Sequence, residues 1–464
     1  MSDQSPSLLR IARDSAAHVP SGRLHRVLGV TFGIAVAVGN SIAAGILRAP
    51  GEVAGFLPYA GLFVGVWAAG GIYALLSAMQ LAELGALVPR SGGQYVFARR
   101  AIGPYAGFIV GWSDWLSTCG TISAISIVIG EYLADLFPQL AGFTPRIAIA
   151  VAVLFALLQW RGVKWGERAQ EITSLLKGLV FAVVVAGCFL LGGKTSVASS
   201  AAAAPHMPLA VAVILALQAV IYTYDGWNGP VYFSEEMKDP GREVPRALFG
   251  SVFSIMGIYL LVNAALVYAL PVSRMAGDNF ALGTAAAIFL GPMGRKLVLA
   301  LMVVSLLSAV NANTLMATRV LFAVSRDGLV NRRAAQVNPG GTPTISLVAG
   351  TVVAIAFIAT GTFEAVIEML AYFFVANYTI SFLSLFILRR REPDSPRPYR
   401  VWGYPYTTGL VLLGSVAFLV GGVAADLKDA SATRHYSIYA LALLILSYPA
   451  YRLLRRKGYE REAE

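Results

Sequence analysis

The sequence predicts an all-α polytopic membrane protein in which two of the spanning helices are broken. Of its 464 residues, 57% are hydrophobic and only 13% are charged, whereas about a quarter of the residues of soluble domains are charged. Apolar runs long enough to cross a bilayer as helices recur along the chain. Two of them, at residues 36–47 and 219–231, contain small and polar residues near their centres. Two interrupted runs in corresponding places indicate a transporter built from two inverted halves.

Twelve apolar runs divide the chain into predicted spans and loops. The third and eighth runs are longer than a bilayer requires, so we expect each to tilt or to carry a non-spanning extension. The stretch 192–204, rich in Ala, Ser and Gly, reads as an external loop. The approximate spans are 28–56, 59–86, 104–137, 145–160, 169–192, 209–234, 247–270, 283–324, 344–360, 364–388, 406–424 and 437–453.

The distribution of Lys and Arg predicts that both termini are cytoplasmic. The two tails and the even-numbered gaps hold most of these residues, for example in the run 389–391, and cytoplasmic loops carry such an excess. This placement explains the net charge of +11 without a nucleic-acid partner. The tail 1–26 shows no signal-peptide pattern. We therefore expect a multi-pass protein of the cell (inner) membrane.

The first broken run reads VAVGNSIAAGIL over residues 36–47. In lipid, irregular backbone survives only where it faces protein or a water-filled cavity. The N-terminus of a half-helix exposes amide donors that favour a carboxylate. The candidate binding residues here are Ile42, Ala43, Ala44 and Gly45, with the amides of the last three as the donors.

The second broken run contains YTYDGWNGP over residues 222–230. The C-terminal end of a half-helix exposes carbonyls that favour an ammonium group, and an α-amino acid carries both charged groups. A simple kink is the alternative explanation for one such break. The aromatic rings either cover a bound side chain or pack against lipid and protein. The candidate residues are Tyr222, Thr223 and Asp225 through their carbonyls, Tyr222 and Trp227 through their rings, and Asn228 through its amide.

Lys177 lies inside the fifth apolar run. A lysine at this depth costs several kcal/mol unless it has a partner. It either snorkels to the cytoplasmic interface or is a fixed cation against the carbonyls of the first break, where a sodium-coupled protein would hold an ion. A buried lysine can also lose its proton, so a role in proton coupling stays open. Ser308, in the polar stripe of the eighth run, is a candidate partner of Lys177.

Two acids, Asp114 and Glu83, also lie at or near membrane depth. Asp114 either accepts a proton, pairs with a cation or is a structural hydrogen-bond acceptor. Cys119 and Cys188 both lie in apolar runs, which argues against a disulfide framework and a cysteine metal site. The four histidines have no zinc spacing, and no phosphate loop or hydrolase signature occurs. We therefore expect no metal, no cofactor and no enzymatic activity.

The chain resembles the amino acid–polyamine–organocation superfamily and, within it, the L-type amino acid transporter group. The resemblance covers nearly the whole length after residue 27 and rests on five pieces that occur in order. These pieces are VPRSGGQYVF at 88–97, YDGWN at 224–228, SEEMKDPGREVPRA at 234–247, RVLFAVSRDG at 319–328 and RPYRVWGYP at 397–405.

The resemblance implies a LeuT-like fold of five plus five inverted helices with two further helices, discontinuous first and sixth helices, a central α-amino acid site and sodium independence. It also implies that Lys177 matches the fifth-helix lysine and Tyr222 the aromatic gate. The chain departs from the usual Gly-Ser-Gly of the first break, since it has Ala43, Ala44 and Gly45. Asp225 stands where several relatives have a small residue, which would favour cationic substrates if its side chain faces the site.

These observations predict a sodium-independent carrier of α-amino acids, neutral ones ahead of cationic ones, working by alternating access as an exchanger or proton-coupled symporter. A cationic amino acid or polyamine carrier is the alternative, and a non-transporting amino acid sensor is another. The expected partners are an amino acid, membrane lipid and, with coupling, protons. The animal relatives pair with a glycoprotein through a loop cysteine, and both cysteines here are intramembrane, so no such partner is expected. The predicted layout is a tail 1–26, a repeat core 27–400, helices 11 and 12 in 401–454 and a tail 455–464.

Overall fold

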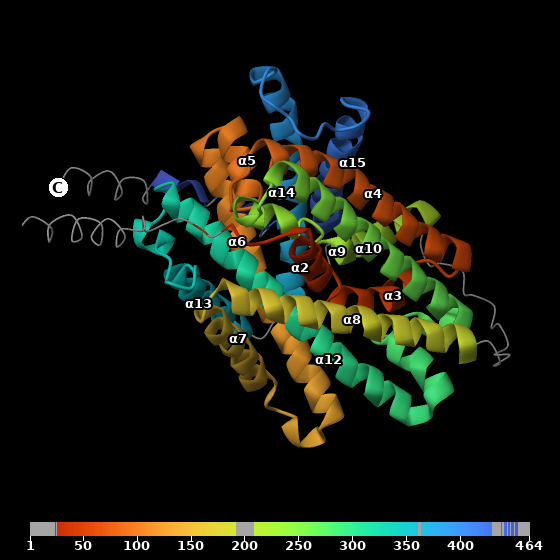
Figure 1. Ribbon diagram of the computed structural model, residues 1–464. Coiled ribbons are helices and arrows are strands. Elements are labelled where there is room, and N and C mark those ends of the chain that lie inside the picture. The colour runs from red at the N-terminus through yellow and green to blue at the C-terminus, as the bar shows by residue number, and fades with distance from the viewer. Residues whose placement is uncertain are drawn as a thin grey trace, which may run out of the picture.

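The computed structural model is built from helices that run in opposite directions around a common core (Figure 1). It describes residues 24, 26–191, 208–360 and 363–428 and, near the C-terminus, residues 438, 440–442, 444, 445, 447–449, 451 and 452. Within these residues there is no β-strand, only isolated bridges between Leu28 and Met237 and between Val337 and Pro343. The prediction of an all-α architecture is therefore confirmed for the described chain.

The helices follow the predicted apolar runs closely. Those that form the body of the protein are α2 (Val30–Ser41), α3 (Ala44–Phe56), α4 (Ala60–Leu87), α5 (Gln94–Ala101), α6 (Pro104–Leu136), α7 (Thr144–Trp160), α8 (Val163–Leu191), α9 (Leu209–Tyr224), the 3₁₀ helix η3 (Gly229–Glu236), α10 (Pro240–Ala269), α12 (Ala281–Arg326), α13 (Thr344–Thr360), α14 (Phe363–Arg391) and α15 (Tyr406–Lys428).

By length and hydropathy, seven of the described helices can cross a membrane, and the bent pair α2–α3 adds an eighth span if it is counted as one. Four further apolar helices are shorter: Thr144–Trp160, Thr344–Ala359, Tyr406–Gly421 and Ala440–Pro449. The chain is thus a polytopic membrane protein, while the number of twelve spans stays a prediction. The predicted external loop 192–204 lies outside the described residues, as do six of the seventeen residues of the twelfth run, 437–453.

The long third and eighth runs differ in structure: the third forms one continuous helix, and the eighth forms a kinked one. Helix α6 continues through 33 residues from Pro104 to Leu136. Helix α12 is instead kinked at Gly291, which has φ 64° and ψ −162°, a conformation that glycine adopts at little cost. The apolar span within α12 begins at Leu290, so residues 281–289 precede it; that they form a non-spanning extension stays a prediction.

The first broken run is two helices that meet at an angle. Helix α2 ends at Ser41, α3 begins at Ala44, and their axes are bent by 47°. The second broken run ends its α-helix at Tyr224 and passes through a turn at residues 225–228. Beyond that turn lies the eight-residue 3₁₀ helix η3, where the sequence had suggested a second α-helical half. Pro230, whose main-chain nitrogen carries no hydrogen to donate, is the second residue of η3.

The two broken runs lie against each other in opposite directions. Helix α2 packs against η3, and α3 packs against α9, so the part before one break meets the part after the other. Gly226 has φ 103°, and a Cβ there would come within 2.7 Å of the Asn40 side chain. Gly45 lies so near Thr223 that a Cβ would be 3.2 Å from its Cα. Small residues at these positions allow the two breaks to approach closely.

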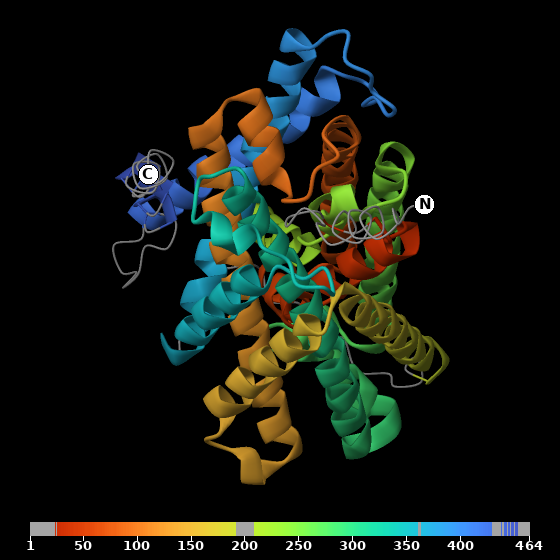
Figure 2. The ribbon, with the colours of Figure 1, turned by 60° about the vertical axis from the view of Figure 1, so that its left-hand side comes forward.

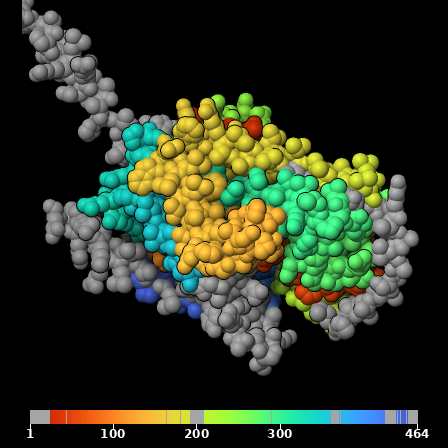
Figure 3. All heavy atoms as spheres, turned by 90° about the horizontal axis from the view of Figure 1, so that it is seen from below, coloured from red at the N-terminus to blue at the C-terminus, as the bar shows by residue number. Residues whose placement is uncertain are grey.

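Other helices enclose this pair. Helix α10 packs against α2 and α4, α8 against α2, and α12 against both α6 and α8, as Figure 1 shows for the neighbouring α8 and α12. In Figure 2 the adjoining ends of α6 and α7 project on the same side as the first part of α12, and Figure 3 shows the molecule from that side. The breaks therefore lie inside the bundle, away from its ends.

Ion pairs join the helices at the end of the bundle opposite to the junction of α6 and α7. Arg90, Arg326 and Arg389 lie at this end, which we call the basic end. Arg319 forms a two-point pair with Glu236 at 3.0 and 3.1 Å, and both side chains are fully buried. Asp327 forms ion pairs with Arg90 and Arg99 and accepts a hydrogen bond from the Tyr95 hydroxyl. Burial of this carboxyl raises its pKa, but these three partners outweigh burial and leave the pKa below its usual value.

Glu83, noted in the sequence as an acid near membrane depth, has a structural role here. Its carboxylate is fully buried and accepts hydrogen bonds from Arg389 at 2.8 and 2.5 Å and from the amide of Val401 at 2.8 Å. Arg397 lies 3.2 Å away. Two guanidinium groups and one amide compensate the burial of one carboxylate.

Glu236→Gln should destabilise the protein, because it leaves the buried guanidinium of Arg319 without its counter-charge. Loss of one member of a buried pair costs about 3–5 kcal/mol. Thermal unfolding in detergent, with exposed Asp239→Asn as a matched control expected to change stability by less than about 0.5 kcal/mol, measures the difference. Equal unfolding temperatures for the two variants would contradict this view of the pair.

Candidate functional site

Side chains from three surrounding helices satisfy the carbonyls of the first break. Lys177 of α8 donates to Gly39 O at 2.9 Å and to Ile42 O at 2.5 Å. Tyr259 of α10 donates to Ser41 O at 2.6 Å, and Ser305 of α12 lies 3.4 Å from Ile42 O. One helical turn earlier, Ser174 and Gln170 donate to Ala35 O. The break therefore keeps its backbone bonded without water.

Lys177 does not snorkel. Only 1% of the residue is exposed, and its ammonium lies against the two carbonyls of the break. These two contacts are the ones that the fixed-cation hypothesis places at the first break; that Lys177 acts there as a fixed cation stays a prediction. Ser308 hydrogen bonds instead with Gln170 and Ser174, at 3.1 and 3.2 Å, and no described contact joins it to Lys177. The coupling roles of Lys177 and Ser308 stay predictions.

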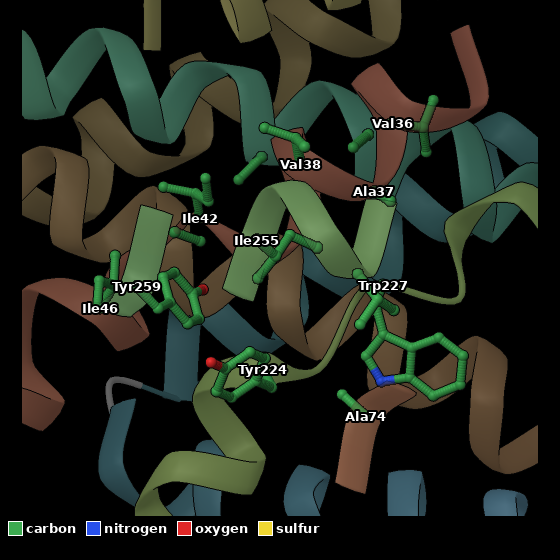
Figure 4. Packing of buried hydrophobic residues seen from close by; sticks show 14 of the residues in the cluster. Val36, Ala37, Val38, Ile42, Ile46, Ala74, Tyr224, Trp227, Ile255 and Tyr259 are labelled. Atoms are coloured by element: carbon green, nitrogen blue, oxygen red, sulfur yellow. The ribbon is translucent and has the colours of Figure 1, made fainter. Parts of the chain in front are cut away.

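Tyr259 ties the two breaks together. Its hydroxyl lies 2.6 Å from Ser41 O in the first break and 2.9 Å from Thr223 O in the second, so one O–H group serves both carbonyls. Its ring packs against Tyr224 and Trp67, with centroids 4.9 and 5.7 Å away. Figure 4 shows the two tyrosine rings side by side, with Ile46 next to Tyr259.

Several of the predicted backbone donors and acceptors already have partners. In the first break, the Ala43 amide donates to Ser41 O at 2.9 Å. In the second, Tyr222 O accepts from the Asp225 amide at 3.1 Å, and Thr223 O accepts from Tyr259. A carbonyl has two lone pairs, so these two acceptors keep capacity for a further donor.

A cavity lies between the two breaks. Six candidate residues line it: Ala43, Gly45, Tyr222, Thr223, Asp225 and Asn228. Ile42 is fully buried and Trp227 is 3% exposed, and neither lines the cavity. The Trp227 ring stacks on Tyr378 with centroids 5.4 Å apart and planes at 12°, which agrees with the packing alternative for this ring. For Ala44, the structure describes the backbone at the start of α3 and not the side chain.

Residues outside the candidate set complete the cavity wall. They are Asn40, Ser41, Thr118, Thr121, Ala124, Ile125, Tyr232, Asn313, Met316 and Phe374. Asn313 donates to Asn40 at 2.5 Å, which joins α12 to the first break. Asn40 lies within the first broken run, so its place in the sequence was a signal for it. Thr118 and Thr121 of α6 gave no sign of facing a cavity.

Two acids belong to this region. Asp225 lines the cavity, and its Oδ1 accepts a hydrogen bond from Tyr378 at 2.6 Å. Asp114 of α6 does not line the cavity itself. It lies behind the cavity-lining Tyr232, whose hydroxyl donates to Asp114 Oδ1 at 2.8 Å. No group of three or more His, Cys, Asp or Glu in the described chain has the geometry of a metal site.

A polytopic helical protein with a polar cavity between two broken helices belongs to the class of membrane transporters. Comparison with known families defines it further: the family described as amino acid permease matches residues 26–447, and the chain belongs to this family. The resemblance seen in the five sequence pieces is thereby confirmed.

Similar proteins include transporters of bacteria and mammals. The chain is 26% identical over 410 residues to the serine/threonine exchanger SteT of Bacillus subtilis, covering 87% of this chain and 92% of that protein. It is 27% identical to the human large neutral amino acids transporter small subunit 2, covering 82% and 72%. It is 25% identical to the human b(0,+)-type amino acid transporter 1, covering 82% and 79%.

Tyr259→Phe should weaken the link between the breaks, because Thr223 O loses its donor while Ser41 O keeps the Ala43 amide. A buried carbonyl left without a partner costs roughly 1–3 kcal/mol, so we expect a loss of stability of about that size. Thermal unfolding measures it. Tyr224→Phe is the matched control, since its hydroxyl bonds to Trp67 O at 3.1 Å, a carbonyl inside a helix; a larger loss in this control would contradict the assigned role of Tyr259.

Proposed function

We propose that this protein is a sodium-independent transporter of α-amino acids, neutral ones in preference, that works by alternating access as an exchanger or a proton-coupled symporter. The observation that carries the proposal is the cavity between two broken helices whose free ends face it. Helix α3 starts at Ala44, and α9 ends at Tyr224. The partial positive charge of a helix start favours a carboxylate, and the partial negative charge of a helix end favours an ammonium group.

In this proposal the amides of Ala44 and Gly45 bind the substrate carboxylate. The carbonyls of Tyr222, Thr223 and Asp225 bind its ammonium, and the ring of Tyr222 together with the amide of Asn228 contacts its side chain. Ile42 and Trp227 do not contact the substrate in this proposal; they are buried and pack outside the cavity, next to the two breaks. A substrate held mainly by backbone groups is recognised through its α-amino acid part, which leaves the side chain free to vary.

The size of the cavity favours a small substrate. Its volume is about 50 Å³. By the same measure one water molecule needs roughly 10–15 Å³, so the cavity has room for only a few water molecules. A compact side chain such as that of alanine, serine or threonine fits this space better than a long one. Similarity to a serine/threonine exchanger supports the same preference.

The alternative, a cationic amino acid or polyamine carrier, has one specific observation in its favour. Asp225 lines the cavity with a carboxylate that has a hydroxyl donor, Tyr378, and no Lys or Arg within 4 Å in the described chain. A substrate ammonium or guanidinium could pair with it. A sensor that binds without transporting is favoured by no observed feature.

We further propose that Lys177 replaces a bound sodium ion. Its ammonium supplies a fixed positive charge to the carbonyls of Gly39 and Ile42, which a sodium-coupled protein would offer to the ion. Ser308 supports it indirectly, through the Ser174 and Gln170 side chains on the same helix. Uptake should accordingly be unchanged when sodium is replaced by choline.

The membrane arrangement completes the proposal. We infer twelve spans, cytoplasmic termini and a place in the cell membrane, with tail, core and terminal helices divided at residues 26, 400 and 454. The basic end would then face the cytoplasm, in accord with the excess of Arg in its loops. We expect no disulfide-linked glycoprotein, because Cys119 and Cys188 are both buried.

A counterflow panel in proteoliposomes tests the substrate class. Vesicles loaded with serine should take up labelled alanine, serine and threonine, while arginine and putrescine should compete about tenfold less well or worse. Strong exchange of arginine or putrescine would favour the alternative, and Asp225→Asn should then reduce that exchange selectively. Binding of amino acids without counterflow would indicate a sensor.

Lys177→Ala should reduce uptake about tenfold or more, since losing a charged hydrogen bond costs roughly 1.5–3 kcal/mol. Lys164→Ala is the matched control, because that lysine lies exposed near the start of the same helix and its loss should leave uptake unchanged. Unaltered uptake and pH dependence in Lys177→Ala would refute the fixed-cation role.

A further inference from the structure

Among the buried acids that the structure describes, Asp114 has the fewest compensating partners. It is 1% exposed, within α6, and only its Oδ1 has a hydrogen-bond donor, the Tyr232 hydroxyl at 2.8 Å. Its Oδ2 is buried without any hydrogen-bond partner. No Lys or Arg pairs with it among the described residues, whereas Glu83 and Glu236 have guanidinium partners. An ionised carboxylate in such surroundings is costly, and uptake of a proton removes most of that cost.

The groups around Asp114 leave it without a counter-charge. The titratable groups that act on it directly are Tyr232 and, through its like charge, Asp225. Other titratable and charged side chains on the elements packed against α6 have partners elsewhere: Tyr378 bonds to Asp225, Tyr95 and Arg99 to Asp327, and Arg319 to Glu236. The like charge of Asp225 adds to the cost of ionising Asp114.

Asp225 differs from Asp114 in its surroundings. It accepts hydrogen bonds from the Tyr378 hydroxyl and from the Gly226 amide, and it lines the cavity, where water or substrate can reach it. The Asp225 carboxylate therefore has two donors and access to a polar cavity, whereas the Asp114 carboxylate has one donor and no such access. Of the two acids, Asp114 is the less compensated one, and it is the one suited to hold a proton.

Tyr232 connects Asp114 to the cavity. The residue lines the cavity wall beside Asn228, and its hydroxyl donates to Asp114. When Asp114 is ionised, this O–H group is bound to it. When Asp114 is protonated, the acid can itself act as a donor, and the Tyr232 hydroxyl is free to donate to a group in the cavity.

We propose that Asp114 is a proton-binding site of this protein and that Tyr232 relays its charge state to the substrate cavity. The proton comes from water and forms one O–H bond at Oδ2; no electrons move and no bond of the substrate changes. The second half of this inference rests on the transport function proposed above, while the first half concerns the resting protein alone.

Infrared spectroscopy of the reconstituted protein tests the proton site without reference to transport. The wild type should show a carboxylic-acid C=O band that shifts in deuterated buffer and disappears as pH rises. Asp114→Asn should lack this band, and Asp225→Asn should keep it. Tyr232→Phe should keep the band but lose it about one pH unit higher, because the ionised form loses its donor. A band that is identical in Asp114→Asn and wild type at every pH overturns the proposal, whereas a general folding defect would alter the amide bands as well.

Proton movement driven by a serine gradient, followed with a pH dye in the same vesicles, tests the relay. Asp114→Asn should lower this movement about tenfold or more relative to wild type. A variant that moves protons at the wild-type rate overturns the relay, as does a wild type that exchanges serine and moves no protons. Absence of counterflow in the wild type would refute the proposed transport function, and the infrared result would still decide whether Asp114 holds a proton.

Discussion

Every peptide group freed by a helix break inside a bilayer has to find a partner within the protein. In this chain that constraint determines which side chains surround the centre. The carbonyls of Gly39, Ser41, Ile42 and Thr223 point out of broken helices, and they are bonded by Lys177 and Tyr259. Helices α8 and α10 are thereby fixed in register against the breaks. The cavity is the space that remains between the two breaks once these bonds are made.

The breaks themselves could be predicted from local chemistry. Several Gly, Asn and Pro residues grouped in the middle of an apolar run weaken a helix there, although a single one, such as Pro50 in α3, does not end it. Lys177 could also be singled out, because a cation in an apolar run must have a partner. Its partners could not be named with certainty from the sequence, because snorkelling satisfies the same requirement. The 3₁₀ form of η3 was not predicted either.

Other parts of the site left no local signal. A tyrosine in an apolar run, such as Tyr259, cannot be told from any packed or interfacial tyrosine by its local sequence. Its role depends on hydrogen bonds to two carbonyls that are distant in sequence. The same holds for the buried pairs. Glu236 and Arg319 are 83 positions apart, and Glu83 and Arg389 are 306 apart. Which charges pair is decided by tertiary packing, so the sequence marked Glu83 as an acid near membrane depth without showing its partners, and it did not mark the pair of Glu236 and Arg319.

The surroundings of Glu83 have a consequence for movement. Its carboxylate joins α4 to the end of α14 through Arg389 and to the segment before α15 through Arg397 and the Val401 amide. Separating these elements would leave the buried Glu83 carboxylate without its guanidinium partners, which costs about 3–5 kcal/mol. In the transport cycle proposed above, we therefore expect α4, the end of α14 and the segment before α15 to move as one unit. We expect the other helices to bend at the two interruptions of regular backbone, residues 42–43 and 225–228.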